Sequence, residues 1–216
     1  MRTAEAVAQT SPATAPPESP YAVTYIEVEP AQADASRRLL VRYQEALKDK
    51  GALEFAVFEQ MGRPNHFAIV ERWPGAKARE DSAAAAASRE FRATLAPLLI
   101  APYDERPHFA LSMAPKAATP AAVYVVTHVD VVPPKRDEGA AEVRKLAEAS
   151  RGTAGNVRFD ALVQASRLNH LTLVEAWTDA PAREAHSAAN PTKSFRSALG
   201  PMSGALYDER LYTLLK

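Results

Sequence analysis

The sequence predicts an α+β protein made of two tandem ferredoxin-like (βαββαβ) domains whose sheets pack together into one barrel. Three observations lead to this expectation: an internal repeat, the order of strand and helix patterns in each half, and strands that are apolar on both faces. The 216 residues suffice for one large domain or two domains of about 100 residues. The hydrophobic fraction of 47% is enough to bury a core, which excludes wholesale disorder.

The repeat appears when the two halves are compared directly. Residues 23–28 (Val-Thr-Tyr-Ile-Glu-Val) correspond to residues 126–131 (Val-Thr-His-Val-Asp-Val), an offset of 103. After one inserted residue the offset is 104, and residues 65–106 align without gaps on residues 169–210, with 20 of the 42 positions identical. A period near 100 residues is too long for a solenoid repeat. We therefore interpret the repeat as the duplication of a whole domain.

The same comparison gives the domain boundaries. Residues 1–20 are dominated by Ala, Pro, Thr, Ser and Glu, a composition that indicates a solvated, disordered tail. The stretch 113–122 contains two prolines among small residues and is typical of a linker. We expect a tail at 1–20, a first domain at 21–112, a linker at 113–122 and a second domain at 123–216.

Within each half the patterns follow the order β-α-β-β-α-β, the ferredoxin-like plan. Gly51 stands where a helix C-terminal glycine belongs, and residues 61–65 have the composition of a hairpin turn. In the second half, Pro191 after Asn190 indicates a new helix start. The expected strands of the first half are 22–29, 53–60, 66–73 and 103–112, and the expected helices are 30–50 and 76–95, with 134–151 and 180–199 as their counterparts.

Alternation along residues 169–177 indicates what covers the second face of each sheet. One set of alternating positions holds Leu171, Leu173 and Trp177, and the other holds Thr172, Val174 and Ala176. A sheet with helices on one side and water on the other alternates more cleanly. We therefore expect the second face to pack on the sheet of the other half, so that a monomer contains an internal pseudo-dimer.

Composition and charge exclude several classes of function. With 26 basic and 26 acidic residues the chain lacks the electrostatic surface that nucleic acids or anionic membranes attract, and no apolar run reaches the roughly 20 residues of a membrane span. The absence of cysteine excludes disulfides, thiolate nucleophiles and Cys-ligated metals. No metal or nucleotide motif is present, so we expect neither a metal nor a cofactor. We expect a cytoplasmic protein, although residues 6–9 (Ala-Val-Ala-Gln) resemble the end of an export signal, so an exported form stays open.

The run Asn-His-x-x-x-Val-Glu-x-Trp followed by Ala-Arg-Glu-Ala-His (169–177 and 182–186), together with the repeat and the element order, resembles the antibiotic biosynthesis monooxygenase (ABM) family. The resemblance implies the dimeric α+β barrel fold, with the tandem copy replacing the usual homodimer. It covers everything except the tail and the linker. The family includes cofactor-free quinol and polyketide monooxygenases, haem-degrading enzymes and members without known activity.

The resemblance also implies a pocket between the sheet and the helices of each half. In the second half it brings in His186, Trp177, Asn169 and His128 as catalytic candidates and Glu175 as a substrate-binding residue. The corresponding first-half residues, Asn65, Trp73 and Tyr25, are candidates for substrate binding. Because His186 and His128 correspond to Ser82 and Tyr25, we expect the working pocket in the second half.

These residue types suit a cofactor-independent monooxygenase that oxidises a quinol-like or polyphenolic small molecule with dioxygen. A histidine titrates near neutrality and can take the phenol proton, because the anion gives an electron to dioxygen more readily than the neutral phenol. Apolar walls exclude water, and an amide or guanidinium holds the charged oxygen. This hypothesis predicts that His186→Ala abolishes turnover.

Structural roles compete with the catalytic ones. Trp73 and Trp177 occur in both halves, which favours core packing, and Glu175 can be a strand-end residue bonded to an arginine. The repeated Tyr-Asp-Glu-Arg favours holding the closing strand, and the Asn-His pairs favour a turn with an exposed histidine. The alternative functions are a non-catalytic barrel that binds a small ligand, and a haem-binding or haem-degrading protein with His186 on the iron.

Overall fold

A computed structural model describes residues 21–114 and 121–216 of the chain. The expected tail, 1–20, and most of the expected linker, 113–122, lie outside the described residues. The first half comprises β1 (Tyr21–Glu27), η1 (Pro30–Gln32), α1 (Ala33–Leu47), β2 (Glu54–Gln60), β3 (Arg63–Arg72), α2 (Ala76–Ala84), α3 (Ala86–Leu95), η2 (Ala96–Leu98) and β4 (Asp104–Ser112). The second half comprises β5 (Val123–Asp130), η3 (Pro133–Lys135), α4 (Arg136–Arg151), β6 (Asn156–Gln164), β7 (His170–Trp177), α5 (Ala180–Ala188), α6 (Asn190–Leu199), η4 (Gly200–Met202) and β8 (Asp208–Leu214).

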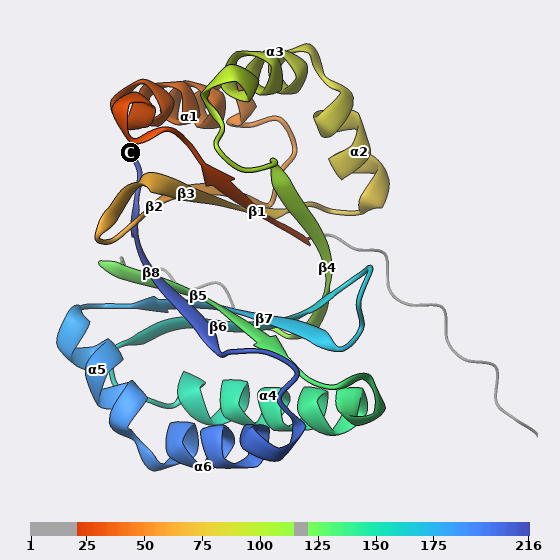
Figure 1. Cartoon of the computed structure of the whole chain (residues 1–216), viewed down its shortest axis with the longest axis vertical. Coiled ribbons are helices and arrows are strands. Elements are labelled where there is room, and N and C mark those ends of the chain that lie inside the picture. Colours follow the sequence, from red (N-terminus) through yellow and green to blue (C-terminus); the bar gives the residue numbers. More distant parts are fainter. Residues whose placement is uncertain (1–20, 115–120) are drawn as a thin grey trace, which may run out of the picture.

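The eight strands form one closed antiparallel barrel in the order β1-β3-β2-β8-β5-β7-β6-β4. The halves join at two seams, β2 with β8 (Phe58 opposite Leu214) and β4 with β6 (Phe109 opposite Val163). The two sheets lie face to face, and the helices cover their outer faces (Figure 1). The predicted tandem ferredoxin-like domains and their intramolecular barrel are thereby confirmed.

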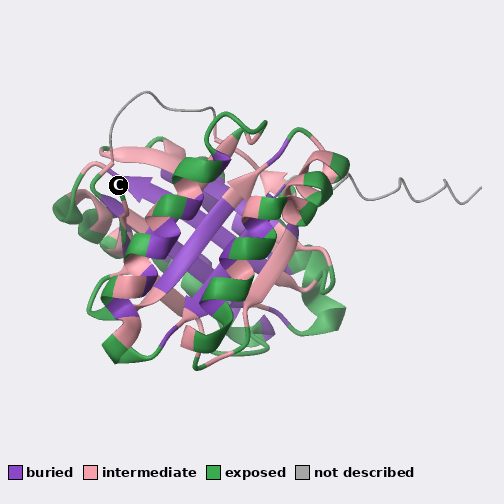
Figure 2. Ribbon diagram, turned by 90° about the horizontal axis from the view of Figure 1, so that it is seen from above, coloured by how far each residue is buried: buried purple, intermediate pink, exposed green. Residues whose placement is uncertain are grey.

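Three hydrophobic clusters occupy the layers of this arrangement. One lies under the helices of the second half and one under those of the first, while the third includes Val23, Phe58 and Val174 and fills the barrel between the sheets. Helix α1 contributes Leu40, Tyr43 and Leu47, whose spacing of three and four residues puts them on one helix face. Figure 2 shows the buried residues on the inward faces of the helices and the exposed ones on the outward faces. Both faces of each sheet are buried, as the alternation predicted.

The helix that the sequence predicts over 76–95 is interrupted, and that prediction is wrong at one point. Ala85 has φ −64° and ψ 153°, an extended conformation that separates α2 from α3. Ala189 repeats it at φ −72° and ψ 155°, where Pro191 correctly indicates a second helix start. The Ser88 hydroxyl donates to the carbonyl of Ser82 at 2.7 Å, and the Thr192 hydroxyl to that of His186 at 2.8 Å. These side-chain bonds satisfy carbonyls that the break leaves free.

The end of α1 also differs from expectation. The helix stops at Leu47, and Asp49 with φ 60° is the first left-handed residue beyond it. Gly51 has φ 94° and lies in the following turn, where a positive φ is least costly for glycine.

Candidate functional site

The predicted site residues of the second half lie on opposite faces of its sheet. Successive side chains of a strand point to opposite faces, so Val125 and Val129 of β5 pack beneath the helices. His128, between them, faces the barrel, where its ring lies 5.2 Å from that of Tyr25. His186 and Trp177 lie on the helix side. The expectation of one pocket containing both histidines is therefore wrong.

His186 fills the space between the sheet and the helices of the second half. Its ring stacks on Trp177 with centroids 4.6 Å apart and contacts the edge of Phe159 at 5.6 Å. Its Nε2 lies 3.3 Å from the hydroxyl of Thr192, and only 5% of the residue is exposed. Burial and the charges of two nearby arginines lower the pKa of His186 to about 4. An imidazole that is only 5% exposed leaves no room for a haem beside it.

Glu175 binds Trp177 rather than an arginine. It accepts a hydrogen bond from the indole Nε1 at 2.9 Å, and Trp73 donates to Glu71 in the same way at 2.8 Å. Burial raises the pKa of Glu175 to about 7, because a desolvated carboxyl group favours its neutral form. The repetition of this pair in both halves fits a packing role for the tryptophans.

The same space in the first half is filled from a different helix. Tyr43 of α1 meets Phe55 edge-on with ring centroids 5.3 Å apart and stacks on Phe91 at 3.9 Å. Ser82, the counterpart of His186, lines a residual cavity of about 10 Å³ there, which is about the room that one water molecule needs.

Asn65 and Asn169 brace the backbone rather than line a pocket. Each donates its side-chain amide to a carbonyl of the residue that follows the first strand of its half, Val28 at 2.9 Å and Val131 at 2.8 Å. The amide of Asn169 is therefore engaged by the backbone, and its catalytic role stays a prediction. The neighbouring histidines are half-buried, not exposed: the Nδ1 atom of His170 lies 2.9 Å from Asp130.

A cavity of about 760 Å³ lies between the two halves. It is lined by β1, β4, β5 and β8 and by the loops that precede β4 and β8, so that almost every lining residue has a counterpart at the offset of 103 or 104. We call it the central cavity. Its lining residues are Tyr25, Glu27, Ala101, Pro102, Tyr103, Asp104, Arg106, His128, Asp130, Ala205, Leu206, Asp208 and Arg210.

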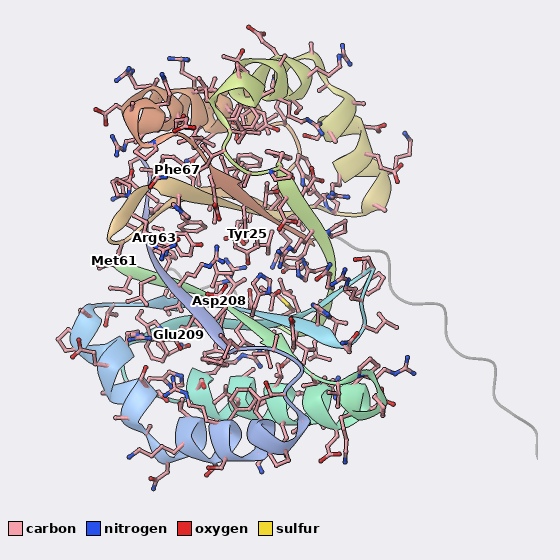
Figure 3. All side chains as sticks on the ribbon, viewed as in Figure 1. Tyr25, Met61, Arg63, Phe67, Asp208 and Glu209 are labelled. Carbon is pink, nitrogen blue, oxygen red and sulfur yellow. The ribbon has the colours of Figure 1, made fainter. Side chains whose placement is uncertain are left out.

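Tyr25 projects from β1 into the space between the sheets (Figure 3). The guanidinium carbons of Arg106 and Arg210 lie 5.0 and 5.4 Å from its ring centroid, within reach of a cation–π interaction. Only 6% of Tyr25 is exposed, and its hydroxyl has no hydrogen-bond partner among the described residues. Burial raises the pKa of Tyr25 well above 10, so the hydroxyl keeps its proton.

A chain of hydrogen bonds fixes His128 beside Tyr25. Arg106 Nη1 lies 2.8 Å from His128 Nε2, and because a guanidinium can only donate, Nε2 is the acceptor. Nδ1 of His128 then carries the proton toward the hydroxyl of Thr172 at 3.4 Å. That hydroxyl lies 2.9 Å from Nε2 of His108, whose Nδ1 donates to the carbonyl of Arg106 at 2.7 Å. Both histidines are thus neutral, and burial lowers the pKa of His128 to about 3 and that of His108 to about 4.

The sequence interpretation missed Arg106, Arg210 and His108. The arginines belong to the repeated Tyr-Asp-Glu-Arg, which we expected to hold the closing strand. The glutamate of the motif does hold the closing strand, because Glu209 pairs with Arg183 and Arg196 on the helices. In Figure 3, Asp208 and Glu209 point to opposite faces of β8. Alternation within the motif was the signal that its aspartate and arginine reach the barrel.

A family model described as antibiotic biosynthesis monooxygenase matches the chain twice, over residues 21–96 and 122–198. The chain belongs to the antibiotic biosynthesis monooxygenase family. The two ABM matches correspond to the two halves of the barrel, so the repeat is a tandem pair of family domains. No curated protein matches the sequence.

Solved structures with the same arrangement of two halves support the ABM fold. A candidate monooxygenase from Fusobacterium nucleatum has a TM-score of 0.80 at 17% identity, over 91% of this chain and 92% of that one. A candidate monooxygenase from Lactobacillus acidophilus has a TM-score of 0.74 at 12% identity, over 91% and 93%. An anthrone oxidase-like protein has a TM-score of 0.72 at 10% identity, over 91% of each chain. At these identities the likeness concerns the fold.

Two further findings bear on the kind of site. In residues 21–114 and 121–216, no three acidic or histidine side chains are grouped so as to hold a metal ion. Among the helices of those residues, none is long and apolar enough to cross a membrane.

Proposed function

We propose that this ABM protein is a monooxygenase that oxidises a small quinol-like or polyphenolic molecule with dioxygen, without a cofactor, in the central cavity. The observation that supports this proposal is Tyr25 in the lining of a cavity of about 760 Å³: its ring lies near two guanidiniums and the neutral His128, and its hydroxyl has no partner among the described residues. Cavities of about 300–1,000 Å³ suit small organic ligands. The working unit is one chain, because both walls of the cavity belong to it.

The reaction needs only a few groups from the protein. A hydroquinone ring supplies all four electrons: one oxygen atom of dioxygen enters the ring, the other leaves as water, and the product is a hydroxyquinone. The first step removes a phenol proton, and a carboxylate of the cavity lining is the acceptor. Arg106 and Arg210 stabilise the phenolate that forms, and Tyr25 donates its free hydroxyl to a substrate oxygen. One of the similar structures is named as an anthrone oxidase-like protein. Anthrone also forms an enol, which fits this class of reaction.

His128 positions Arg106 in this proposal and does not act as the base. Its Nε2 lone pair already accepts from Arg106, so it is not free to take the phenol proton. His186, Trp177 and Glu175 support the helix layer, and Asn169 supports the backbone. The resemblance favoured His186 as the base, so the two locations of the site must be distinguished by experiment.

Dioxygen uptake with a panel of hydroquinones and catechols, corrected for autoxidation, distinguishes these two locations of the site. Tyr25→Phe removes one hydroxyl from the central cavity, and Arg210→Gln removes one guanidinium. We expect each to lower kcat/KM at least tenfold, because each removes a group that touches the substrate oxygen. His186→Ser combined with Leu146→Tyr reproduces the first-half packing and should keep near wild-type turnover.

The reverse outcome, loss of turnover in the His186 variant with wild-type rates in Tyr25→Phe, would move the site to the second half beneath the helices. Uptake no faster than the buffer blank for every compound would contradict an oxygenase. In that event the cavity, and the Tyr25 hydroxyl that lacks a partner among the described residues, favour a non-catalytic barrel that binds a small ligand. A ligand-dependent rise in Tm without turnover would then identify it.

A further inference from the structure

The charged groups that line the central cavity are unequal in number. Two guanidiniums, of Arg106 and Arg210, face four carboxylates, those of Glu27, Asp104, Asp130 and Asp208. His128 adds no charge because it is neutral. The excess is negative although the whole chain has no net charge, so the acidity is a local property of this cavity.

Each guanidinium is paired with an aspartate of its own strand. Arg106 Nη2 lies 2.5 Å from Asp104, and Arg210 Nη2 lies 2.8 Å from Asp208. The two pairs occupy corresponding positions in β4 and β8, two residues apart in each strand. After this pairing, Glu27 and Asp130 carry the remaining negative charge.

Glu27 and Asp130, which also correspond to each other, have histidine neighbours. His66 Nδ1 lies 3.6 Å from Glu27, and His170 Nδ1 lies 2.9 Å from Asp130. Burial and the positive charges of Arg63 and Arg210 lower the pKa of His66, so His66 is neutral at neutral pH and leaves the charge of Glu27 in place. Arg63 lies outside the lining of the cavity.

Two features apart from the carboxylates indicate a ligand with a polar and an apolar end. The buried Tyr25 hydroxyl lacks a partner among the described residues and lines the polar interior. Leu206, which is 92% exposed, stands with Pro102 among the lining residues contributed by the loops before β8 and β4. A ring can lie between these two regions.

We infer that the central cavity selects a phenol that carries an ammonium group over its uncharged and carboxylated analogues. The inference rests on the proposed function, since it names the charge class of that substrate. An ammonium group between Glu27 and Asp130 offsets half of the excess charge, whereas a carboxylate adds to it. Partial enclosure strengthens both effects, because charges interact more strongly away from bulk water.

Three catechols with the same ring and different side chains test this inference: dopamine, 4-ethylcatechol and 3,4-dihydroxyphenylacetate. Their Kd values are measured by calorimetry on the full chain at pH 7.4 without oxygen, so that no turnover occurs. We expect dopamine to bind about tenfold more tightly than the uncharged catechol, and the acid about tenfold more weakly. Glu27→Gln combined with Asp130→Asn should bring the three Kd values together, while Glu138→Gln, on an exposed carboxylate paired with Lys135, should leave their order unchanged.

The outcomes separate the two proposals. Equal Kd values for the three catechols, or tighter binding of the acid, would overturn the charge preference while leaving a phenol-binding cavity. A preference that the double variant keeps would also overturn it, because the charge would then act elsewhere. If none of the three binds, the proposed phenolic substrate is itself contradicted.

Discussion

The two halves of the barrel solve one packing problem with different helices. Against Phe55, the first half places Tyr43 of α1, and against the corresponding Phe159 the second half places His186 of α5. In each half the residue that corresponds to the other half's ring is small or aliphatic: Ser82 corresponds to His186, and Leu146 corresponds to Tyr43. Both halves place an aromatic ring in this space, and the helix that supplies it differs between them. The comparison teaches that a histidine in the family's conspicuous position can be a core residue.

Where the halves meet, they differ in charge instead. Glu54 of β2 and Arg158 of β6 are counterparts at the offset of 104, and they pair with each other at 2.5 Å across the barrel. A symmetric dimer of either half would put two glutamates or two arginines in contact. The pair therefore favours the union of unlike halves over the union of like ones.

Breaking this pair should have the largest effect on stability. Glu54→Arg places a guanidinium against Arg158, whose side chain is only 16% exposed. We expect the free energy of unfolding to fall by about 3 kcal/mol, because the largely buried Arg158 loses one of its two carboxylate partners and gains a like charge in its place. Urea denaturation measures the loss. Asp81→Lys, which breaks the exposed pair with Lys77, should leave the free energy of unfolding nearly unchanged.

The reciprocal change tests the cause. Adding Arg158→Glu to Glu54→Arg restores opposite charges, and we expect part of the lost stability to return. Asp160, which also binds Arg158 at 2.5 Å, opposes a glutamate there and limits the recovery. If the double variant loses more stability than the losses of the two single variants added together, the complementarity of the halves is contradicted.

The packing comparison gives the next prediction. His186→Ser should lower the free energy of unfolding by about 2–3 kcal/mol, because it leaves a cavity against Trp177 and Phe159. Adding Leu146→Tyr supplies the ring from α4, as Tyr43 does from α1, and should recover at least half of the loss. A second substitution that only adds to the damage would show that the two halves are not interchangeable in this way.

The sequence predicts the fold well because the evidence for it is periodic. A domain repeat, alternation along 169–177 and a turn between two strands are local patterns, and together they leave few arrangements. The broken helix at Ala85 was missed because, without a proline, nothing in that stretch marks the break. The hydroxyl of Ser88 that braces it does so only in three dimensions.

The site was harder to predict because it depends on which face of a strand each residue occupies. His128 was grouped with His186 by resemblance, although its alternation with Val125 and Val129 already opposed that. The exchange of Tyr43 for His186 joins positions far apart in the sequence, so neither half reveals it alone. Arg106 and Arg210 were assigned to strand closure as part of a motif, and only the barrel shows that they meet at Tyr25.

The smallest expected effect concerns Glu175, and its pH dependence sharpens the packing comparison. The pKa of Glu175 is about 7 in the folded protein against an ordinary value of 4.5. Between these pH values the folded state keeps a proton that the unfolded chain releases, so the stability that this group contributes is complete below pH 4.5 and lost as pH rises through 7. Gln cannot ionise and can still accept from the Trp177 indole. We therefore expect Glu175→Gln to gain stability relative to the wild type as the pH rises from 4.5 to 8.

His186 supplies an internal control of opposite sign. Its pKa is lowered from 6.5 to about 4, so its contribution to stability is complete above pH 6.5 and lost as pH falls toward 4. The stability of His186→Ser relative to the wild type should therefore improve as pH falls, whereas that of Glu175→Gln should improve as pH rises. Urea denaturation at intervals from pH 4 to 8 measures both curves. Parallel curves for the two variants would mean that the second half does not bury a neutral histidine beside a protonated glutamate, and the packing role of His186 would then be wrong.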